Sequence, residues 1–431
     1  MRTSIIWFKT DLRLYDNETL YRAQEQSDEI IPVYCLDDAH FIKTEFGFQK
    51  TGTYRAKFLL ACLLDLDKRL RNIGSGLIVV KGKPEEEIPK IAKAYNAQRV
   101  YAKKEVAYEE KKAAEKVEKA LWEIKCSLEV YSTSTLYHAQ DLPFPINEIP
   151  DIFTNFRKQV ESDSFIRPVF PSPAHLDSPP IPDLVLPLLG DLGLEDAKVD
   201  KRQAMDFKGG ESEAVLRMQQ YFFERKAISS YKQTRNGMIG DLYSTKFSPY
   251  LSAGCLSPRG IYHQLKIYEE QYGANDSTYW LVFELMWRDY FRFMMKKYHN
   301  RFFQQNGIKS KDHHIASHNQ ELLETWINGK TGDDFVDANM LELKLSGYMS
   351  NRGRQNVASY LVHDLNLDWR YGAAYFEQQL VDYDVCSNWG NWAYQAGVGN
   401  DPRGKRKFNT QKQAEEYDSE GKYRKLWLKK R

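Results

Sequence analysis

Residues 54–80 read YRAKFLLACLLDLDKRLRNIGSGLIVV, and this stretch sets the fold class of the first half of the chain. Apolar side chains recur every four positions from Phe58 to Leu70, as on one face of a helix, and Gly74 closes the pattern. The β-branched run Leu77–Val80 then predicts a strand. Similar runs occur at Ser4–Phe8, Ile30–Leu36, Arg99–Ala102 and Leu128–Tyr131. Strands that alternate with helices predict an α/β domain over residues 1–135, with a Rossmann-like parallel sheet covered by helices on both faces.

The composition is that of an ordinary globular protein, with 42% hydrophobic and 28% charged residues in 431. The N-terminal apolar run is only four residues long before Lys9, which argues against a signal peptide. No run approaches the length of a membrane helix, so no membrane association is expected. The five cysteines are widely spaced and form no CxxC pair, which favours free thiols and a cytoplasmic, reducing location.

A proline-rich segment divides the chain. Ten of the sixteen prolines fall between Pro143 and Pro187, and proline fixes φ and removes a hydrogen-bond donor. We therefore expect a long, irregular but ordered connector over residues 136–200. Beyond it helical periodicity dominates, which predicts a mostly α domain over residues 201–431. The predicted helices cover residues 211–226, 249–269, 275–298, 319–328, 334–346, 351–364 and 370–381.

The segment YSTKFSPYLSAGCLSPR, Tyr243–Arg259, carries a strong local signal. Ser248 and Pro249 form a typical helix start, with Ser248 as N-cap and Pro249 at the first helical position. That interpretation leaves Ser244, Thr245 and Lys246 unexplained at the same entrance. Hydroxyls, backbone N–H groups and a lysine at a helix N-terminus would suit a diphosphate.

Two further segments combine charge with an apolar pattern. In NDSTYWLVFELMWRDYFRFMMKKY, residues 275–298, an aromatic stripe normally marks a core helix. Glu284 and Arg288 lie four residues apart beside that stripe, as a surface ion pair or as a buried functional pair. In GYMSNRGRQNVASYL, residues 347–361, an arginine at a helix start opposes the helix dipole and needs an anionic partner such as Asp382, Asp384 or a phosphate.

Two charge patterns have simpler explanations. His314 and His318 stand four apart in HHIASH, but no carboxylate or cysteine lies at ligand spacing, so no metal site is expected. Residues 402–431 contain 11 basic and 4 acidic side chains. Such a tail is usually a solvated end, and a nucleic-acid footprint is the alternative.

The stretch DYDVCSNWGNW, Asp382–Trp392, places acids, amides and indoles together. With WFKTDLRLYDN near the N-terminus, FELMWRDYFRF, SNRGRQNVASYL and the Tyr243–Arg259 segment, it resembles the photolyase/cryptochrome family over nearly the whole chain. TRNGM, the Gln of SNRGRQ and STLYHAQDLPF are most similar to DASH-type cryptochromes. The resemblance implies an all-α domain that binds FAD, and an antenna pigment near the α/β domain.

The resemblance also assigns flavin-binding positions. The flavin would meet the amide of Asn351 at its N5, with Arg354 paired to Asp382 beside the ring. An amide and an arginine there would support a reduced, anionic flavin, whereas a carboxylate would oppose it. The positions that resemble flavin-binding residues of the family are Tyr231, Ser244, Thr245, Lys246, Phe247, Ser248, Glu284, Trp287, Arg288, Asn351, Arg354, Asp382, Asp384 and Asn388.

By the same resemblance, the expected activity is light-driven repair of cyclobutane pyrimidine dimers in DNA by an electron from excited reduced FAD. Glu284 would hydrogen-bond the flipped lesion, and Trp287 and Tyr394 would stack on it, at about 1–3 kcal/mol per stacked base. Arg235, Arg352 and Lys407 would meet phosphates, which makes binding salt-sensitive. Tyr394 in place of a second indole, and Gln355 beside the cavity, suggest weaker capture of the lesion. That favours single-stranded, UV-damaged DNA, in which flipping costs least.

Trp392 and Trp369 resemble the first two members of the family's electron-transfer chain to the surface. The usual third tryptophan corresponds to Ala316 here, so either photoreduction is weakened or another aromatic such as Tyr375 or Trp326 takes that place.

For the antenna, Glu105 matches a position that contacts methenyltetrahydrofolate in DASH-type relatives, and a plain surface glutamate at a strand end is the alternative. A blue-light photoreceptor with little repair activity is the second functional hypothesis. Long C-terminal extensions often carry signalling in cryptochromes, and the short basic tail here favours repair.

Overall fold

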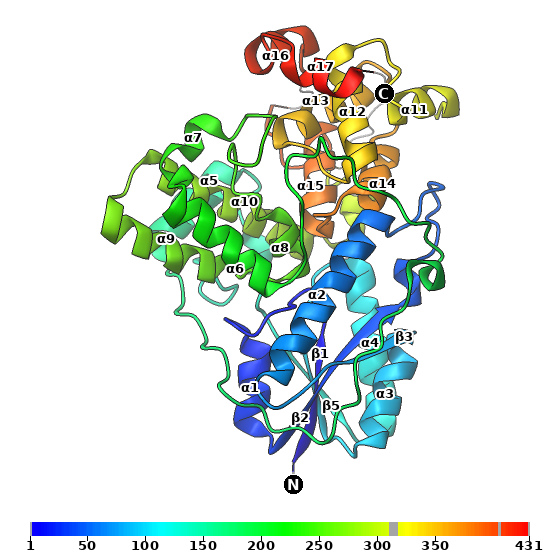
Figure 1. Ribbon diagram of the computed structural model, residues 1–431, viewed down its shortest axis with the longest axis vertical. Coiled ribbons are helices and arrows are strands. Elements are labelled where there is room, and N and C mark those ends of the chain that lie inside the picture. The colour runs from blue at the N-terminus through cyan, green and yellow to red at the C-terminus, as the bar shows by residue number, and fades with distance from the viewer. Residues whose placement is uncertain (1, 310–317, 404–406, 430–431) are drawn as a thin grey trace.

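The computed structural model describes residues 2–309, 318–403 and 407–429, which form an α/β domain and a helical domain (Figure 1). Five parallel strands make one sheet in the order β3-β2-β1-β4-β5. The predicted α/β class with a parallel sheet is confirmed, and each strand lies within two residues of its predicted bounds. The strands are β1 Thr3–Phe8, β2 Glu29–Asp37, β3 Ile78–Gly82, β4 Arg99–Lys103 and β5 Ser127–Tyr131.

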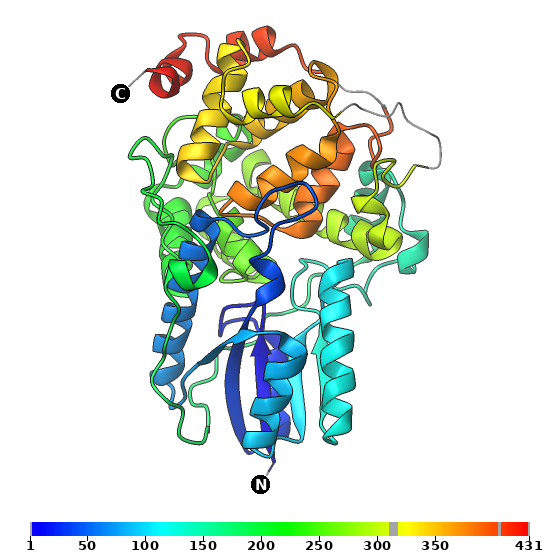
Figure 2. The ribbon, with the colours of Figure 1, turned by 90° about the vertical axis from the view of Figure 1, so that its right-hand side faces the viewer.

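Both faces of the sheet are covered, because side chains alternate along each strand. Ile5 and Trp7 of β1 pack toward α3 (Pro84–Ala94) and α4 (Tyr108–Glu123). Ile6 and Phe8 share the opposite core with α1 (Glu18–Gln26) and α2 (Thr53–Arg71). In Figure 2 the long α2 runs beside the sheet and up to the helical domain.

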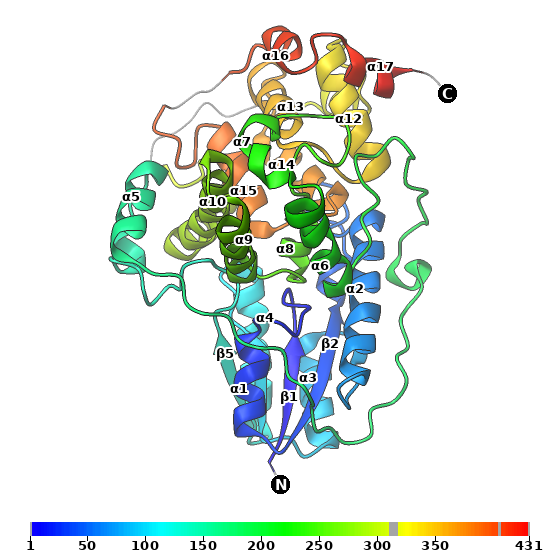
Figure 3. The same cartoon turned by 60° about the vertical axis from the view of Figure 1, so that its left-hand side comes forward.

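The connector is more regular than its prolines predict. It contains a helix, α5 (Phe153–Asp163), because Phe153, Phe156 and Val160 recur on one face and are buried. After α5 the chain passes along the outside of the α/β domain as an extended segment before it enters the helical domain (Figure 3). No helix in the described ranges has the length and apolar content needed to cross a bilayer.

The second domain is helical, as predicted, but several bounds differ. The single helix expected over 249–269 is two helices, since Gly254 adopts a left-handed conformation and Pro258 starts the second one. Four helices of this domain were not predicted: α7 (Tyr231–Thr234), α15 (Val385–Gln395), α16 (Thr410–Tyr417) and α17 (Lys422–Leu428). The other elements are α6 Glu211–Gln219 with a π-turn at Gln220–Glu224, α8 Ser248–Ala253, α9 Pro258–Tyr272, α10 Asp276–Tyr298, α11 Gln320–Ile327, α12 Asp334–Ser346, α13 Asn351–His363 and α14 Trp369–Gln379.

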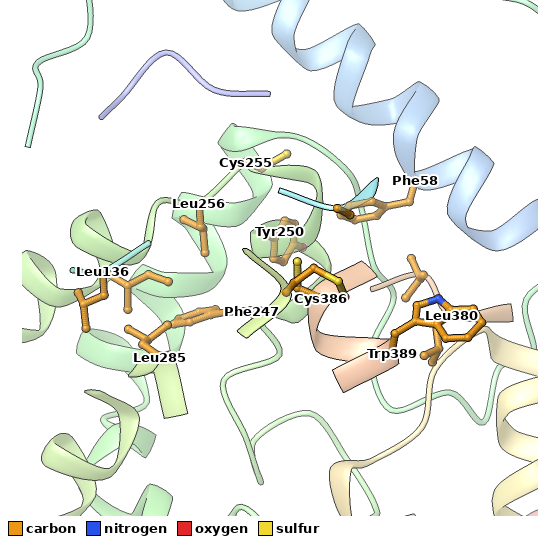
Figure 4. Packing of buried hydrophobic residues seen from close by; sticks show 14 of the residues in the cluster. Phe58, Leu136, Phe247, Tyr250, Cys255, Leu256, Leu285, Leu380, Cys386 and Trp389 are labelled. Atoms are coloured by element: carbon orange, nitrogen blue, oxygen red, sulfur yellow. The ribbon is translucent and has the colours of Figure 1, made fainter. Parts of the chain in front are cut away.

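The domains meet where the strands end. Gly254, with φ +76°, lies so close to the loop after β1 that a Cβ atom would come within 2.2 Å of the carbonyl oxygen of Thr10. A shared core continues across this contact. Figure 4 shows Phe58 of α2 beside Tyr250 of α8, with ring centroids 5.6 Å apart. The carboxyl ends of the strands, where ligands of such sheets bind, therefore face the helical domain.

The basic C-terminal segment is folded rather than a simple solvated end. Tyr423 and Trp427 of α17 are buried in a small core against α12. The Tyr423 hydroxyl donates to Glu342 at 2.5 Å, and Arg202, just after the connector, donates to the carbonyl of Leu426 at 3.0 Å. These contacts fix the last described helix to the body of the domain.

Candidate functional site

A polar hollow opens between α13, α15 and the loop that joins α14 to α15. Seven residues singled out from the sequence line it together: Asn351, Arg354, Gln355, Asp382, Asp384, Asn388 and Trp392. The fold thus brings two segments thirty residues apart in sequence into one wall. Sequence reasoning missed seven other lining residues: Ala358, Phe376, Leu380, Tyr383, Ser387, Asn391 and Gln395.

An ion pair spans this hollow. Nη2 of Arg354 lies 3.0 and 2.8 Å from the two carboxylate oxygens of Asp382, and Nε donates to the carbonyl of Met349 at 2.9 Å. The expected pair is therefore present, and it answers the need of an arginine at a helix start for an anionic partner. Asp382 is buried, so the pair fixes the α14–α15 loop against α13.

Three of the missed residues, Ser387, Asn391 and Gln395, lie on α15. Asp384 caps this helix by accepting from the backbone N–H of Ser387 at 2.7 Å. From there the polar side chains follow at steps of three and four residues, through Asn388 and Asn391 to Gln395. That is the spacing of one helical face, so the hollow would have been traced further had the segment been recognised as a helix.

The loop before α8 supplies a second polar feature, centred on Lys246. Its backbone is left-handed, with φ +60°, and its side chain is 2% exposed. Nζ makes no hydrogen bond within the described part of the chain and lies 3.1 Å from the ring centroid of Tyr243. Burial lowers the pKa of Lys246 well below its ordinary value. A buried amine without a hydrogen-bond acceptor, on a backbone of unfavourable conformation, lowers the stability of the fold. Such a feature indicates a ligand-binding role.

Arg354 is paired with Asp382, whereas Lys246 has no hydrogen-bonded acid. Lys246 and Arg354 both approach the ring of Tyr348, with centroid distances of 4.8 and 5.4 Å. Glu342 is the buried acid whose charge faces Lys246, and burial raises its pKa to about 7. A partly protonated acid compensates a lysine poorly, so this region favours an anion.

The start of α8 differs from the prediction. Ser248 is not an N-cap but the first helical residue, because Phe247 already has a helical backbone, with φ −79° and ψ −12°. The helix has only six residues, so a helix dipole contributes little here. Arg217 instead orders the loop before α8, because it donates to the backbone carbonyl of Thr245 at 3.0 Å. Thr245 and Phe247 are buried in this loop, and Ser244 is partly exposed.

Helix α10, which packs against α15, carries Glu284, but the proposed pair with Arg288 is wrong. Glu284 binds Arg235 of the loop after α7, and it accepts from Nε1 of Trp280 at 3.1 Å. Arg288 turns the other way and donates to the carbonyls of Ser134 and Leu251. Burial raises the pKa of Glu284, against the opposing charge of Arg235 and the Trp280 hydrogen bond.

Two aromatic rings adjoin this carboxyl. Trp287, one turn after Glu284, meets Tyr394 of α15 at right angles, with centroids 6.0 Å apart. Arg403 donates to the hydroxyl of Tyr394 at 3.1 Å. Tyr231 is buried in the same region, and the charge of Glu284 contributes to raising its pKa after burial itself.

The other expected phosphate contacts are already engaged by protein groups. Arg352 donates to Asn236 at 2.9 Å and to Gln355 at 3.0 Å. Lys407 is exposed and lies 2.6 Å from Asp364. A nucleic acid would have to compete with these partners or be received beside them.

The tryptophans form two separate branches, and no ring contact among the described residues joins Trp392 to Trp369. Trp392 of the hollow contacts Trp326, with centroids 6.2 Å apart, and Trp326 contacts the buried Tyr375 at 5.8 Å. Trp369 contacts Trp389 at 5.7 Å. Position Ala316 and most of the histidine segment His313–His318 lie outside the described residues. Among the described residues, no group of three His, Cys, Asp or Glu side chains is arranged for a metal.

This geometry can be set against known proteins. The DNA photolyase family matches residues 4–175, and the FAD binding domain of DNA photolyase matches residues 280–430. A protein of Danio rerio named Cryptochrome DASH is 48% identical over 432 residues, which cover 99% of this chain and 83% of the relative. The crystal structure of a Synechocystis sp. PCC6803 cryptochrome is 46% identical, covers 99% of this chain and 89% of its own, and has a TM-score of 0.96.

The chain belongs to the cryptochrome DASH group of the photolyase/cryptochrome family.

More distant members share the fold. An archaeal photolyase from Sulfolobus tokodaii, solved with two FAD molecules, is 27% identical, with a TM-score of 0.79 over 99% of this chain and 90% of that one. The coarse identity of the hollow follows: it lies in the FAD-binding domain of a photolyase-family protein.

A second, larger cavity of about 660 Å³ lies between the domains of this cryptochrome DASH. The α/β domain lines it with His40, Lys50, Arg55 and Glu110, and the helical domain with Trp389. Burial and the charge of Glu105 raise the pKa of Glu110 to about 7.

Glu105 itself lies behind the cavity wall, and the alternative of a surface glutamate is wrong. Its carboxylate binds Arg292 at 2.8 Å and Lys103 at 3.0 Å, and Thr10 donates to it at 3.1 Å. Glu105 is 8% exposed, and the cavity reaches its partners Thr10 and Arg292 rather than the carboxylate.

Proposed function

We propose that this protein is a light-driven DNA repair enzyme that reverses cyclobutane pyrimidine dimers, chiefly in single-stranded DNA, with FAD as cofactor. The observation that carries the proposal is the group formed by Glu284, Trp287 and Tyr394. Helix α10 supplies a carboxyl of raised pKa and an indole, and the indole meets a phenol ring of α15, the helix that lines the polar hollow. Photolyase-family membership supports this reaction class.

The chain's own residues fit the cofactor. Arg354 and the amide of Asn351 at the start of α13 favour a flavin ring that carries negative charge, and Asn388 adds a polar contact from α15. The orphan ammonium of Lys246 fits the diphosphate, since a phosphate oxygen would supply the missing hydrogen-bond acceptor. When bound, reduced FAD supplies one electron under light to the dimer.

Glu284 has a defined task in this proposal. Arg235 and the Trp280 indole hold its carboxyl in place, so that it can hydrogen-bond a pyrimidine carbonyl or N–H of a lesion that stacks on Trp287. Its raised pKa favours the protonated form more than in water, and that form can donate as well as accept.

The preference for single strands rests on the modest stacking surface. Trp287 and Tyr394 offer one indole and one phenol, and Gln355 is held by Arg352 at the rim. A lesion that is already unpaired needs less binding energy for extrusion. Phosphate contacts from Arg235, Arg352 and Lys407 would then position the strand.

The interdomain cavity supports an antenna pigment, which we propose to be methenyltetrahydrofolate. A flat ring could lie against Trp389 and Phe46, and anionic tail groups could meet Lys43, Lys50 or Arg55. Glu105 would act from behind the wall by holding Arg292 in place. Because the Sulfolobus tokodaii photolyase has two FAD molecules, a second flavin is the competing occupant.

The deciding experiment is repair of a dimer-containing thymine oligomer under blue light, single-stranded and duplex in parallel, with chemically reduced enzyme. We expect repair mainly in the single strand. Glu284→Ala should keep the flavin content and lower repair per photon by at least tenfold. Glu161→Ala is the matched control, because Glu161 pairs with Arg157 on α5 and should leave repair unchanged.

Full flavin content without repair of either substrate would overturn the enzyme proposal and favour a blue-light photoreceptor. Loss of flavin in Glu284→Ala would instead assign that carboxyl a structural role in the cofactor site.

A further inference from the structure

The connector helix α5 reaches the group formed by Glu284, Trp287 and Tyr394. Phe153, its first residue, lies flat on the indole of Trp287, with ring centroids 3.7 Å apart and planes inclined by 11°. Aromatic pairs usually prefer an offset or edge-to-face arrangement over such a close parallel one. The surroundings must therefore hold the two rings in place.

Several contacts fix Phe153. Two rings of α10 present their edges to it, Phe283 at 5.2 Å and 85° and Tyr290 at 5.5 Å and 76°. Just before α5, the backbone carbonyl of Asp151 accepts from the Tyr290 hydroxyl at 2.6 Å, and its carboxylate accepts from Lys297 at 2.8 Å. Phe153 is 6% exposed, so its ring has no freedom to turn away.

The consequence for Trp287 is that one face of the indole is closed. Trp287 nevertheless stays partly exposed, and the Tyr394 ring stands perpendicular to it. Phe291 also lies against the indole, with centroids 5.6 Å apart and planes inclined by 30°. The surface that remains for a ligand is therefore the part of Trp287 that neither Phe153 nor Phe291 covers.

We infer that Phe153 is a positioning residue of the substrate pocket, and that it sets the plane of Trp287 on which the pyrimidine dimer stacks. This inference rests on the proposed function. It goes beyond it by making a helix of the interdomain connector part of the pocket. A flat ring is needed for this role, whereas simple filling of the core would need only volume.

That distinction can be tested with two leucine substitutions. Phe153→Leu removes the flat face from Trp287. Phe156→Leu is the matched control, because Phe156 lies one turn later, is fully buried, and has Phe153, Tyr290 and Phe293 rather than Trp287 among its ring neighbours. Both leucine variants should have their unfolding temperatures lowered by similar amounts, and both should retain flavin. Should Phe153→Leu not fold, Phe153→Met fills the same space with a flexible side chain.

The measurement is binding in the dark of fluorescent single-stranded oligomers, with and without a dimer, followed by repair kinetics. We expect Phe153→Leu to lower the preference for the dimer about tenfold and raise KM, with the rate at saturation within about twofold of wild type. Phe156→Leu should match wild type. Phe153→Tyr, which keeps the ring, should restore most of the preference.

If Phe153→Leu and wild type prefer the dimer-containing oligomer equally, the inference is overturned and the proposed function is not affected. Equal losses in Phe153→Leu and Phe156→Leu would also overturn it, because they would show a general packing effect. A wild-type protein without any preference for the dimer would instead overturn the proposed function, and the inference with it.

Discussion

One nitrogen of the Arg354 guanidinium binds both carboxylate oxygens of Asp382, at 3.0 and 2.8 Å. The two residues lie 28 positions apart, on the first turn of α13 and in the loop before α15. This pair joins the two walls of the polar hollow, so the loop and the cofactor site depend on each other.

Asp382→Asn should therefore weaken flavin retention and stability together. Breaking a buried ion pair leaves an uncompensated charge and typically costs about 3–5 kcal/mol. Flavin loss on dialysis and the unfolding temperature of the apoprotein are the measurements. Asp183→Asn is the control, because Asp183 is fully exposed in the connector. Normal flavin retention in Asp382→Asn would contradict the role given to the pair.

Lys246 predicts proton uptake on cofactor binding. Burial lowers its pKa in the free protein, and a nearby diphosphate would raise it again. The affinity for FAD should fall as the pH rises above the pKa that Lys246 has in the free protein, because the amine must then take up a proton when FAD binds. Lys246→Met should abolish the uptake and weaken FAD binding at least tenfold, while the apoprotein becomes no less stable.

Calorimetry in two buffers of different ionisation enthalpy measures the protons taken up. Lys208→Met removes an exposed lysine and should change neither quantity. If proton uptake is unchanged in Lys246→Met, the diphosphate does not bind at Lys246.

Trp392 should be required for light-driven reduction of the flavin, because it lines the hollow. Trp392→Phe should lose photoreduction while the chemically reduced variant still repairs. Of the two branches, Trp326 leads to the buried Tyr375, whereas Trp369 contacts Trp389, which lines the interdomain cavity. The family resemblance assigns the second step to Trp369, so Trp369→Phe should lose more photoreduction than Trp326→Phe. Flash spectroscopy of the three variants tests this, and the reverse order would assign the route to Trp326.

Glu105 makes the domain contact sensitive to acid. Burial alone would raise its pKa, but the charges of Lys103, Arg292 and Lys9 outweigh burial and hold it well below its usual range. A carboxyl with a depressed pKa adds stability above its unfolded pKa of about 4.3, and this is lost as pH falls further. Glu105→Gln should thus lose several kcal/mol, about 3–5, at pH 7, and this difference should shrink below about pH 4. Denaturant unfolding of both proteins across that range is the check.

The sheet was predictable because the signal for each strand lies within the residues of that strand. The three central strands are short apolar runs buried on both faces, so composition alone marks them, as at Ile30–Leu36, and the edge strands β3 and β5 are partly exposed. The helix at 153–163 was missed because prolines dominate its neighbourhood. The helix at 385–395 was missed because its amides serve the hollow, and their functional pattern hides the helical one.

The site was predictable where one motif supplies the residues, and not where tertiary contacts do. Arg354 and Asp382 were found through family motifs and the charge of a helix start. The partner of Glu284 was not, since four-residue spacing suggested Arg288, while Arg235 comes from a loop 49 positions away. No local pattern predicts that Phe153 covers Trp287, because the contact joins the connector to α10.

The backbone contact between Gly254 and Thr10 has a consequence for photophysics. Excitation transfer between two pigments depends on their separation and on the angle between their transition dipoles. Two domains that touch main chain to main chain at this point have less freedom to tilt toward each other. The mutual orientation of a pigment in the interdomain cavity and one in the helical domain would then vary less from molecule to molecule, and so would the efficiency of light harvesting.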